Sequence, residues 1–114
     1  MSIETDPEKF FPQIVTSCRE AFGCDVVLTR YDPVTCSVVL SQIIAKEPGK
    51  GKGTQCMKYL LERLEEIGIK KINLVVSPLE RYSIKQDIQR LIKWYGGFGF
   101  KVIDITNSEM ELLL

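Results

Sequence analysis

The chain has 114 residues, enough for one domain with a substantial core but too few for two. Lysine and arginine together number 15, as do aspartate and glutamate, so the formal net charge is zero. No overall electrostatic field attracts nucleic acid or a membrane, and we expect neither as a partner. Histidine is absent, which excludes catalysis by Ser-His, Cys-His or His-metal sites. Any chemistry must use carboxylates, tyrosine, lysine, backbone dipoles or a cofactor.

The N-terminal segment and the cysteines are typical of a cytosolic protein. The stretch MSIETDPEKFFPQIV lacks a basic region followed by an apolar one, so we expect no signal peptide. Without histidine, the spacing of the four cysteines does not resemble a zinc site. These cysteines are Cys18, Cys24, Cys36 and Cys56. We therefore expect reduced thiols in the core, no metal, and a cytoplasmic location.

The N-terminal part of the chain predicts a helix followed by a β-hairpin. Thr5-Asp6-Pro7-Glu8 has the pattern of a helix start. Apolar residues then recur at helical spacing up to Gly23, so we expect a helix over about residues 7–22. The stretches 25–31 and 36–46 are rich in β-branched residues and are separated by a turn signal. They predict an antiparallel pair of strands.

The middle of the chain predicts a helix and a buried strand. Apolar positions from Thr54 to Ile67 lie on one side of a helix that ends at Gly68. The stretch 71–76 is a near-continuous apolar run, which is typical of a central strand covered on both faces.

The C-terminal part predicts a second helix and a final hairpin. The capping box Ser83-x-x-Gln86 begins the helix, and Gly96-Gly97 end it. The stretches 100–105 and 110–114 then form two strands. The resulting order, α-β-β-α-β-α-β-β, predicts a single α/β (α+β) domain with a mixed sheet over residues 1–114.

The segment Pro48-Gly49-Lys50-Gly51-Lys52-Gly53 places a glycine at every second position directly before a helix. Glycine lets the backbone turn sharply and approach a ligand, and the helix start offers free N–H groups to an anion. Lys50 and Lys52 add positive charge, so the segment suits a phosphate group. Its spacing excludes a Walker loop and a G-x-G-x-x-G dinucleotide fingerprint. A flexible basic turn that only connects two elements remains the alternative.

A second unusual stretch, Trp94-Tyr95-Gly96-Gly97-Phe98-Gly99-Phe100, combines aromatic residues and glycines at a helix end. Alone it could be core and a helix cap. Together, however, the two segments resemble the signature segments of the GNAT N-acetyltransferase superfamily in order and spacing. The loop pattern [QR]-x-x-G-x-[GA] is similar to residues 48–53, and its extended form fits through Thr54 and Met57. The later pattern F-Y-x-x-x-G-F is similar to residues 94–100.

The resemblance covers roughly Val26 to the C-terminus and implies a mixed, mostly antiparallel sheet with flanking helices. It also implies an N-acetyltransferase that uses acetyl-coenzyme A and acetylates a primary amine, of a small molecule or a protein lysine, by direct attack in a ternary complex. Tyr95 resembles the tyrosine that protonates the leaving thiolate in this family. The family's loop backbone holds the pyrophosphate, and the pantetheine arm pairs with the strand before it. The cofactor-binding residues implied here are Ile43, Ile44, Gly49, Lys50, Gly51, Lys52, Gly53 and Thr54.

Several alternatives stay open. The general base is unassigned, because Glu47, Glu80 and Asp104 are as readily explained as surface charges. Pro48 stands where the family usually has glutamine or arginine, which favours a catalytically silent coenzyme A-binding or protein-interaction module of the same fold. An adaptor without any cofactor is a third possibility. A homodimer is possible if the C-terminal strand lies at an edge of the sheet.

Overall fold

The computed structural model describes residues 6–46, 51–76 and 85–114. The elements follow the order predicted from the sequence. They are the short 3-10 helix η1 (Pro7–Phe10), α1 (Phe11–Phe22), β1 (Cys24–Asp32), β2 (Ser37–Ala45), α2 (Lys52–Glu66), β3 (Lys71–Val75), α3 (Lys85–Gly96), β4 (Lys101–Asp104) and β5 (Glu109–Leu113). Within the described residues, no helix is both long enough and apolar enough to cross a bilayer.

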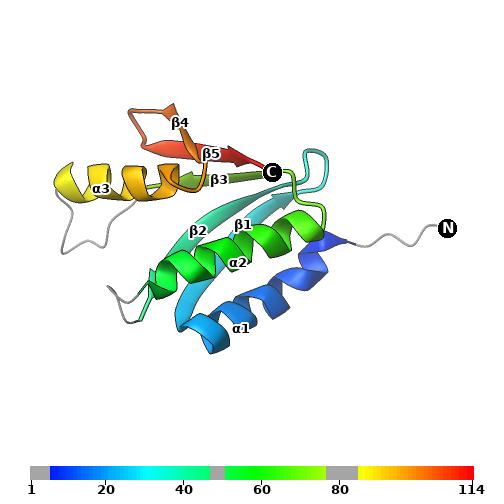
Figure 1. The fold of residues 1–114 in the computed structure, drawn as a ribbon. Coiled ribbons are helices and arrows are strands. Elements are labelled where there is room, and N and C mark those ends of the chain that lie inside the picture. Colours follow the sequence, from blue (N-terminus) through cyan, green and yellow to red (C-terminus); the bar gives the residue numbers. More distant parts are fainter. Residues whose placement is uncertain (1–5, 47–50, 77–84) are drawn as a thin grey trace.

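The five strands form one sheet in the order β1-β2-β3-β5-β4 (Figure 1). Only β2 and β3 run parallel, and the other three pairs are antiparallel. This confirms the predicted mixed, mostly antiparallel sheet with its two hairpins. The C-terminal strand β5 lies between β3 and β4, because the chain crosses over through α3 before returning. The edges are β1 and β4, so the condition under which the C-terminal strand could pair across subunits is not met, and β5 is an internal strand.

The first helix is delimited by the residues that suit its two ends. The side chain of Asp6 accepts a hydrogen bond of 3.1 Å from the backbone N–H of Glu8, so Asp6 caps η1. Thr5, also part of the predicted helix start, lies outside the described residues. At the other end Gly23 has a φ of +64°, and its N–H donates to the carbonyl of Arg19 at 3.0 Å. This left-handed C-cap suits glycine and confirms the predicted end of the helix.

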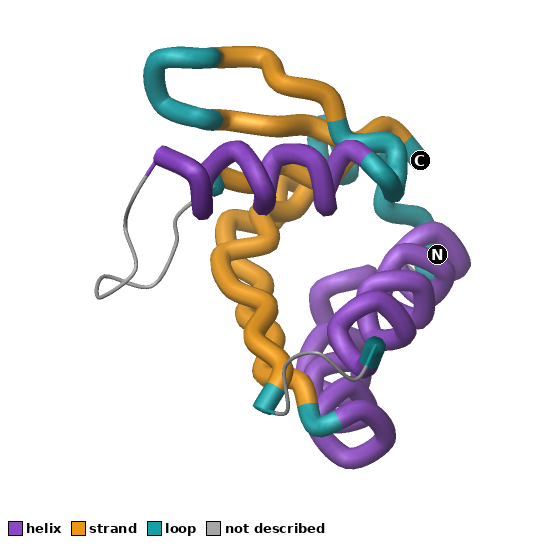
Figure 2. Tube along the Cα trace, turned by 60° about the vertical axis from the view of Figure 1, so that its left-hand side comes forward, coloured by secondary structure: helices purple, strands orange, loops and turns teal. Residues whose placement is uncertain are grey.

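The helices lie together on one side of the twisted sheet (Figures 1 and 2). Strand residues therefore alternate: Ile72 and Leu74 of β3 are buried, whereas Val75 is 56% exposed. In β5, Leu112 is buried next to the 69% exposed Leu113. The prediction that the strand 71–76 is covered on both faces is wrong, because none of the helices in the described residues packs on the far face.

The core lies between this face of the sheet and the helices. Its fully buried members include residues of α1, β1, β2, α2, β3 and β5, among them Ile14, Cys18, Cys24, Val38, Cys56, Met57, Leu60, Leu64, Ile72 and Met110. Three of the four cysteines are free thiols in this core, as predicted, while Cys36 is half-buried.

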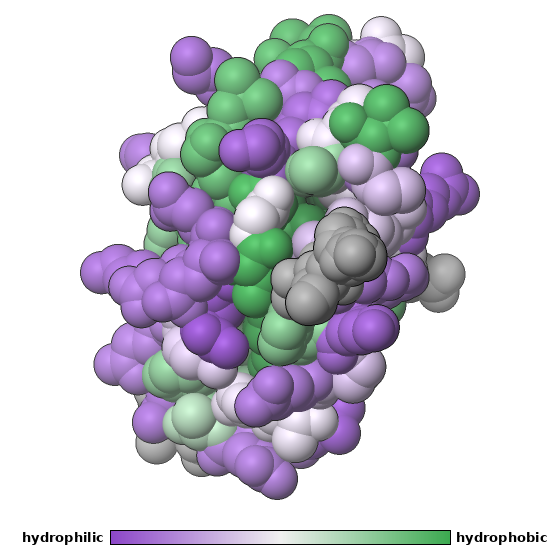
Figure 3. Space-filling view, turned by 90° about the vertical axis from the view of Figure 1, so that its right-hand side faces the viewer, coloured by the Kyte–Doolittle hydropathy of each residue, from purple (hydrophilic) through white to green (hydrophobic). Residues whose placement is uncertain are grey.

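The β4 edge exposes apolar side chains. Figure 3 shows hydrophobic residues at the top of the molecule, the end that the β4–β5 hairpin forms, and Val102, Ile103 and Ile105 are exposed. The pairing register shifts between Val102 and Asp104. Such an irregularity bends an edge strand and makes pairing with a further strand less favourable.

Candidate functional site

Strands β2 and β3 pair over only three residues and then part. Residues 37–39 of β2 are in register with residues 71–73 of β3. Beyond these pairs β2 continues to Ala45 alongside β1, while β3 continues to Val75 alongside β5. Among the described residues, therefore, residues 40–45 of β2 have a neighbouring strand on one side only. Their other edge carries backbone N–H and C=O groups that are available to an extended ligand.

Ile43 and Ile44, which the resemblance places against the pantetheine arm, belong to this free edge. Both side chains are half-buried. Ile43 packs against the core, and Ile44 is the partner of Asp25 in β1. The parting of β2 from β3 therefore lies next to these two residues.

A β-bulge accounts for the change in direction of β2. Val27 is opposite Gln42, but the next residue, Leu28, is opposite Leu40, so Ser41 is an extra residue in β2. A bulge bends its strand and increases the local twist. It lies two residues beyond the last pairing with β3, where the strands diverge. Sequence reasoning missed Ser41, because the bulge depends on the register with β1.

Helix α2 begins at Lys52, two residues earlier than the predicted start at Thr54. Gly51 is its N-cap, with a φ of +76°. The first helical hydrogen bond runs from the N–H of Gln55 to the carbonyl of Gly51, at 3.1 Å. The N–H groups of Lys52, Gly53 and Thr54 precede that bond, and no side chain of the described residues caps the helix. Free N–H groups and the helix dipole at such a position can bind an anion.

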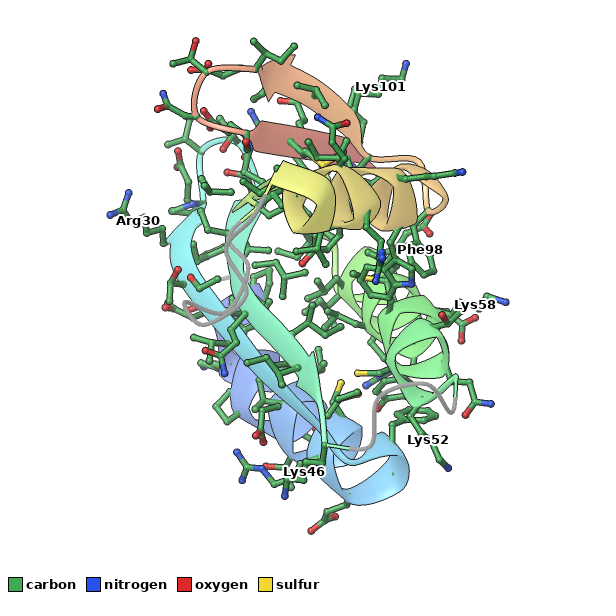
Figure 4. The ribbon with its side chains drawn as sticks, turned by 90° about the vertical axis from the view of Figure 1, so that its left-hand side faces the viewer. Arg30, Lys46, Lys52, Lys58, Phe98 and Lys101 are labelled. Carbon is green, nitrogen blue, oxygen red and sulfur yellow. The ribbon has the colours of Figure 1, made fainter. Side chains whose placement is uncertain are left out.

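Four of the six residues predicted for the phosphate lie in this turn, namely Gly51, Lys52, Gly53 and Thr54. Gly49 and Lys50 fall outside the described residues. Lys46, at the end of β2, and Lys52 lie at the same end of the molecule (Figure 4). Neither forms an ion pair with another described residue. Their positive charge therefore adds to that of the helix start.

The thiol of Cys24 connects β1 to the first turn of α2. Its Sγ donates a hydrogen bond of 3.7 Å to the carbonyl of Lys52. The N–H of Lys46 donates to the carbonyl of Gly23 at 2.9 Å. Both ends of the segment between β2 and α2 are thus fixed to the junction of α1 and β1.

The two sequence motifs meet in space at the end of α3. A Cβ placed on Gly53 would lie 3.8 Å from Cζ2 of Trp94. The indole N–H of Trp94 donates a hydrogen bond to Oγ1 of Thr54 at 3.4 Å. The Phe98 ring centroid is 5.0 Å from that of Trp94, and Figure 4 shows Phe98 between α3 and α2. The aromatic segment therefore packs directly against the anion site.

Tyr95 is half-buried in this aromatic group. Its ring makes edge contacts with Trp94, at a centroid distance of 5.1 Å, and with Phe100, at 5.8 Å. Burial raises the pKa of Tyr95 above the ordinary value of a phenol. The side chain is therefore protonated at neutral pH and can act as a proton donor. The contacts described do not join Tyr95 directly to Ile43 or Ile44.

Asp104, one of the three candidate bases, has a structural role. Its carboxylate accepts hydrogen bonds from the backbone N–H groups of Thr106, at 3.0 Å, and Asn107, at 3.2 Å. It also accepts one from the Asn107 side-chain amide at 3.0 Å. Asp104 thus stabilises the turn between β4 and β5. Glu47 and Glu80 lie outside the described residues.

The fold was compared with known proteins. Two of the solved structures that it resembles are Ard1 from Thermoplasma volcanium and Naa50 from Arabidopsis thaliana, both GNAT N-acetyltransferases. Ard1 matches with a TM-score of 0.57 and 12% identity, over 98% of this chain and 95% of that chain. Naa50, in complex with the bisubstrate analogue CoA-Ac-MVNAL, matches with a TM-score of 0.49 and 18% identity over 77% of this chain. The chain spans 60% of the Naa50 chain.

No protein-family model and no curated protein sequence matches the chain at a significant level. The likeness to Ard1 extends over nearly the whole of both chains. It confirms that this chain has the predicted fold, that of the GNAT N-acetyltransferases.

Proposed function

We propose that the protein binds acetyl-coenzyme A and transfers its acetyl group to a primary amine. The observation that carries the proposal is the parting of β2 from β3 just before the uncapped start of α2. A free strand edge suits an extended chain that contains amides, and a helix start suits a pyrophosphate. In coenzyme A the amides of the pantetheine arm are followed by the pyrophosphate. In this chain the free edge of β2 is followed by the start of α2, which is the same order.

In this proposal the cofactor lies along β2 with its phosphates at α2. The pantetheine amides pair with backbone groups at Ile43 and Ile44. The pyrophosphate accepts hydrogen bonds from the N–H groups of Lys52, Gly53 and Thr54, and the charges of Lys46 and Lys52 attract it. A glycine at position 53 allows an anion to approach the backbone closely.

The proposed reaction is a direct attack in a ternary complex. The amine, as the free base, attacks the thioester carbonyl, and a backbone N–H at the free edge of β2 stabilises the resulting oxyanion. When the tetrahedral intermediate collapses, the C–S bond breaks and the amide is formed. The amine releases its proton to water, Tyr95 donates a proton to the thiolate, and solvent reprotonates Tyr95. The products are the acetylated amine and free coenzyme A.

The proton transfer from Tyr95 requires close contact. A thiolate whose conjugate acid has a pKa of about 8.5 is a weaker base than a phenolate, whose conjugate acid has a pKa of about 10. Burial of Tyr95 widens this difference. A transfer against this gradient proceeds only over a short hydrogen bond between Tyr95 and the thiolate.

A second candidate is a module that binds coenzyme A without transferring an acetyl group. Burial raises the pKa of Tyr95, so this side chain is a proton donor and does not act as a base for the amine. Asp104 is occupied in a turn. Neither of these two described side chains is thus a base for the amine, and a site without any protein base favours a module that only binds coenzyme A.

The two candidates differ in a transfer assay. The protein is incubated with acetyl-coenzyme A labelled in the acetyl group and with three amine classes: peptides with a free N-terminus, N-terminally blocked lysine peptides, and small primary amines. Label in at least one acceptor, reduced by about a hundredfold in Tyr95→Phe, supports the enzyme. Binding of the cofactor without label in any acceptor would instead identify the silent module.

A further inference from the structure

One hydrogen bond joins the two sequence motifs across 40 residues of chain. The indole N–H of Trp94 donates to Oγ1 of Thr54 at 3.4 Å, in a partly buried position. The indole also packs on Gly53, where a Cβ would be 3.8 Å from its ring. The indole therefore lies in contact with the first turn of α2.

The chemistry of the two groups gives this hydrogen bond a direction. An indole N–H can only donate, so Oγ1 of Thr54 must be the acceptor. The hydroxyl hydrogen of Thr54 is then left to donate to another group. In the first turn of a helix a threonine hydroxyl can also bond to nearby backbone groups, and the contact with Trp94 competes with that arrangement. An accepted hydrogen bond also polarises the hydroxyl and makes it a better donor.

We propose that Trp94 is a positioning residue that holds the Thr54 hydroxyl as a hydrogen-bond donor to the pyrophosphate of the cofactor. This inference rests on the proposed function. Thr54 then supplies two donors, its backbone N–H and its hydroxyl, at the anion site. Because Tyr95 follows Trp94 in the chain, the same contact connects the helix end that carries the proposed proton donor to the residues that hold the cofactor.

The test is a calorimetric titration of four variants with coenzyme A. Trp94→Phe keeps an aromatic ring but removes the N–H, and Thr54→Val keeps the shape but removes the hydroxyl. Each variant is expected to weaken binding by roughly three- to tenfold, the range for one hydrogen bond. The double variant is expected to bind coenzyme A no more weakly than the single variant with the lower affinity, because both changes remove the same interaction. Thr54→Ser, which keeps the hydroxyl, is expected to bind as tightly as the wild type.

A second ligand separates positioning from a general structural effect. Acetyl-pantetheine lacks the pyrophosphate, so its Michaelis constant as acetyl donor is expected to be the same for the wild type and Trp94→Phe. If Trp94→Phe weakened the binding of coenzyme A and raised the Michaelis constant for acetyl-pantetheine by the same factor, Trp94 would only maintain the fold. Equal affinity of the wild type and Trp94→Phe for coenzyme A would overturn the inference and leave the proposed function standing. If the wild type does not bind coenzyme A, the proposed function itself fails.

Discussion

Val39 is the last residue of β2 that pairs with β3, and its partner there is Asn73. Six further residues of β2 follow, and all of them except the bulged Ser41 pair with β1, while none pairs with another described strand. The amide groups on their free edge have no strand partner, so they are expected to exchange with solvent faster than those of residues 37–39. Hydrogen exchange followed by mass spectrometry checks this.

Addition of acetyl-coenzyme A is expected to slow exchange at residues 40–45 and at the start of α2. The free edge then gains a hydrogen-bonding partner, and the helix start gains an anion. Protection that appears only in α3 and β5, and not in residues 40–45, would contradict a cofactor bound along β2.

Two glycines of the loop have different roles, and alanine distinguishes them. Gly51 has a φ of +76°, so Gly51→Ala is expected to lower the free energy of unfolding by about 1 kcal/mol or more. A Cβ at Gly53 would meet Trp94 and Ala45 at ordinary contact distances of 3.8 and 3.9 Å. Alanine also suits a helix better than glycine, so Gly53→Ala is expected to leave the stability unchanged or raise it.

The binding of acetyl-coenzyme A is expected to weaken in Gly53→Ala, because the added methyl group hinders the approach of the pyrophosphate to the backbone. Urea unfolding measures the free energy of unfolding, and calorimetric titration measures the affinity for acetyl-coenzyme A. Wild-type affinity in Gly53→Ala would show that no ligand approaches this part of the helix.

The raised pKa of Tyr95 gives its contribution to stability a definite pH dependence. The unfolded phenol loses its proton near pH 10, whereas the folded one keeps it to a higher pH. The stability linked to Tyr95 is therefore fully present below about pH 10 and is lost as the pH rises through the folded pKa. We expect the free energy of unfolding of Tyr95→Phe to fall less steeply above pH 10 than that of the wild type, because the variant lacks this titrating phenol. Unfolding is measured from neutral pH upward. Identical slopes would show that the phenol is not buried.

The four cysteines are expected to differ in reactivity. Cys18, Cys24 and Cys56 are fully buried, whereas Cys36 is half-buried. A hydrogen bond to Cys18 and burial raise the pKa of Cys56, which keeps this thiol protonated and unreactive. Titration of the native protein with a disulfide reagent should therefore detect rapid reaction at Cys36 alone, and none in Cys36→Ser. Rapid modification of a core cysteine would contradict this packing.

The order of the elements could be predicted because each has a local signal. Gly23 ends a helix through its left-handed conformation, and the β-branched stretches on either side of the turn at Asp32 and Pro33 form a hairpin. The predicted start of α2 is two residues late because the apolar pattern begins only after Gly53, and glycine is a poor helix former. The tertiary structure nevertheless holds both in the first turn, where Cys24 bonds to the Lys52 carbonyl.

Features that depend on distant parts of the chain were not predictable. Apolarity along 71–76 does not reveal on which face the helices pack, so the exposure of Val75 was missed. The bulge at Ser41 depends on the register with β1 rather than on local composition. The contact between Trp94 and Thr54 joins residues 40 positions apart, and sequence spacing says nothing about the orientation of an indole.

The central claim is that the parted strands and the start of α2 bind acetyl-coenzyme A. The most direct test is a calorimetric titration of the protein with this cofactor. We expect binding at one site per chain, with a weaker affinity in Gly53→Ala at undiminished stability. A titration without heat, together with an unchanged melting temperature at saturating cofactor, would contradict the account.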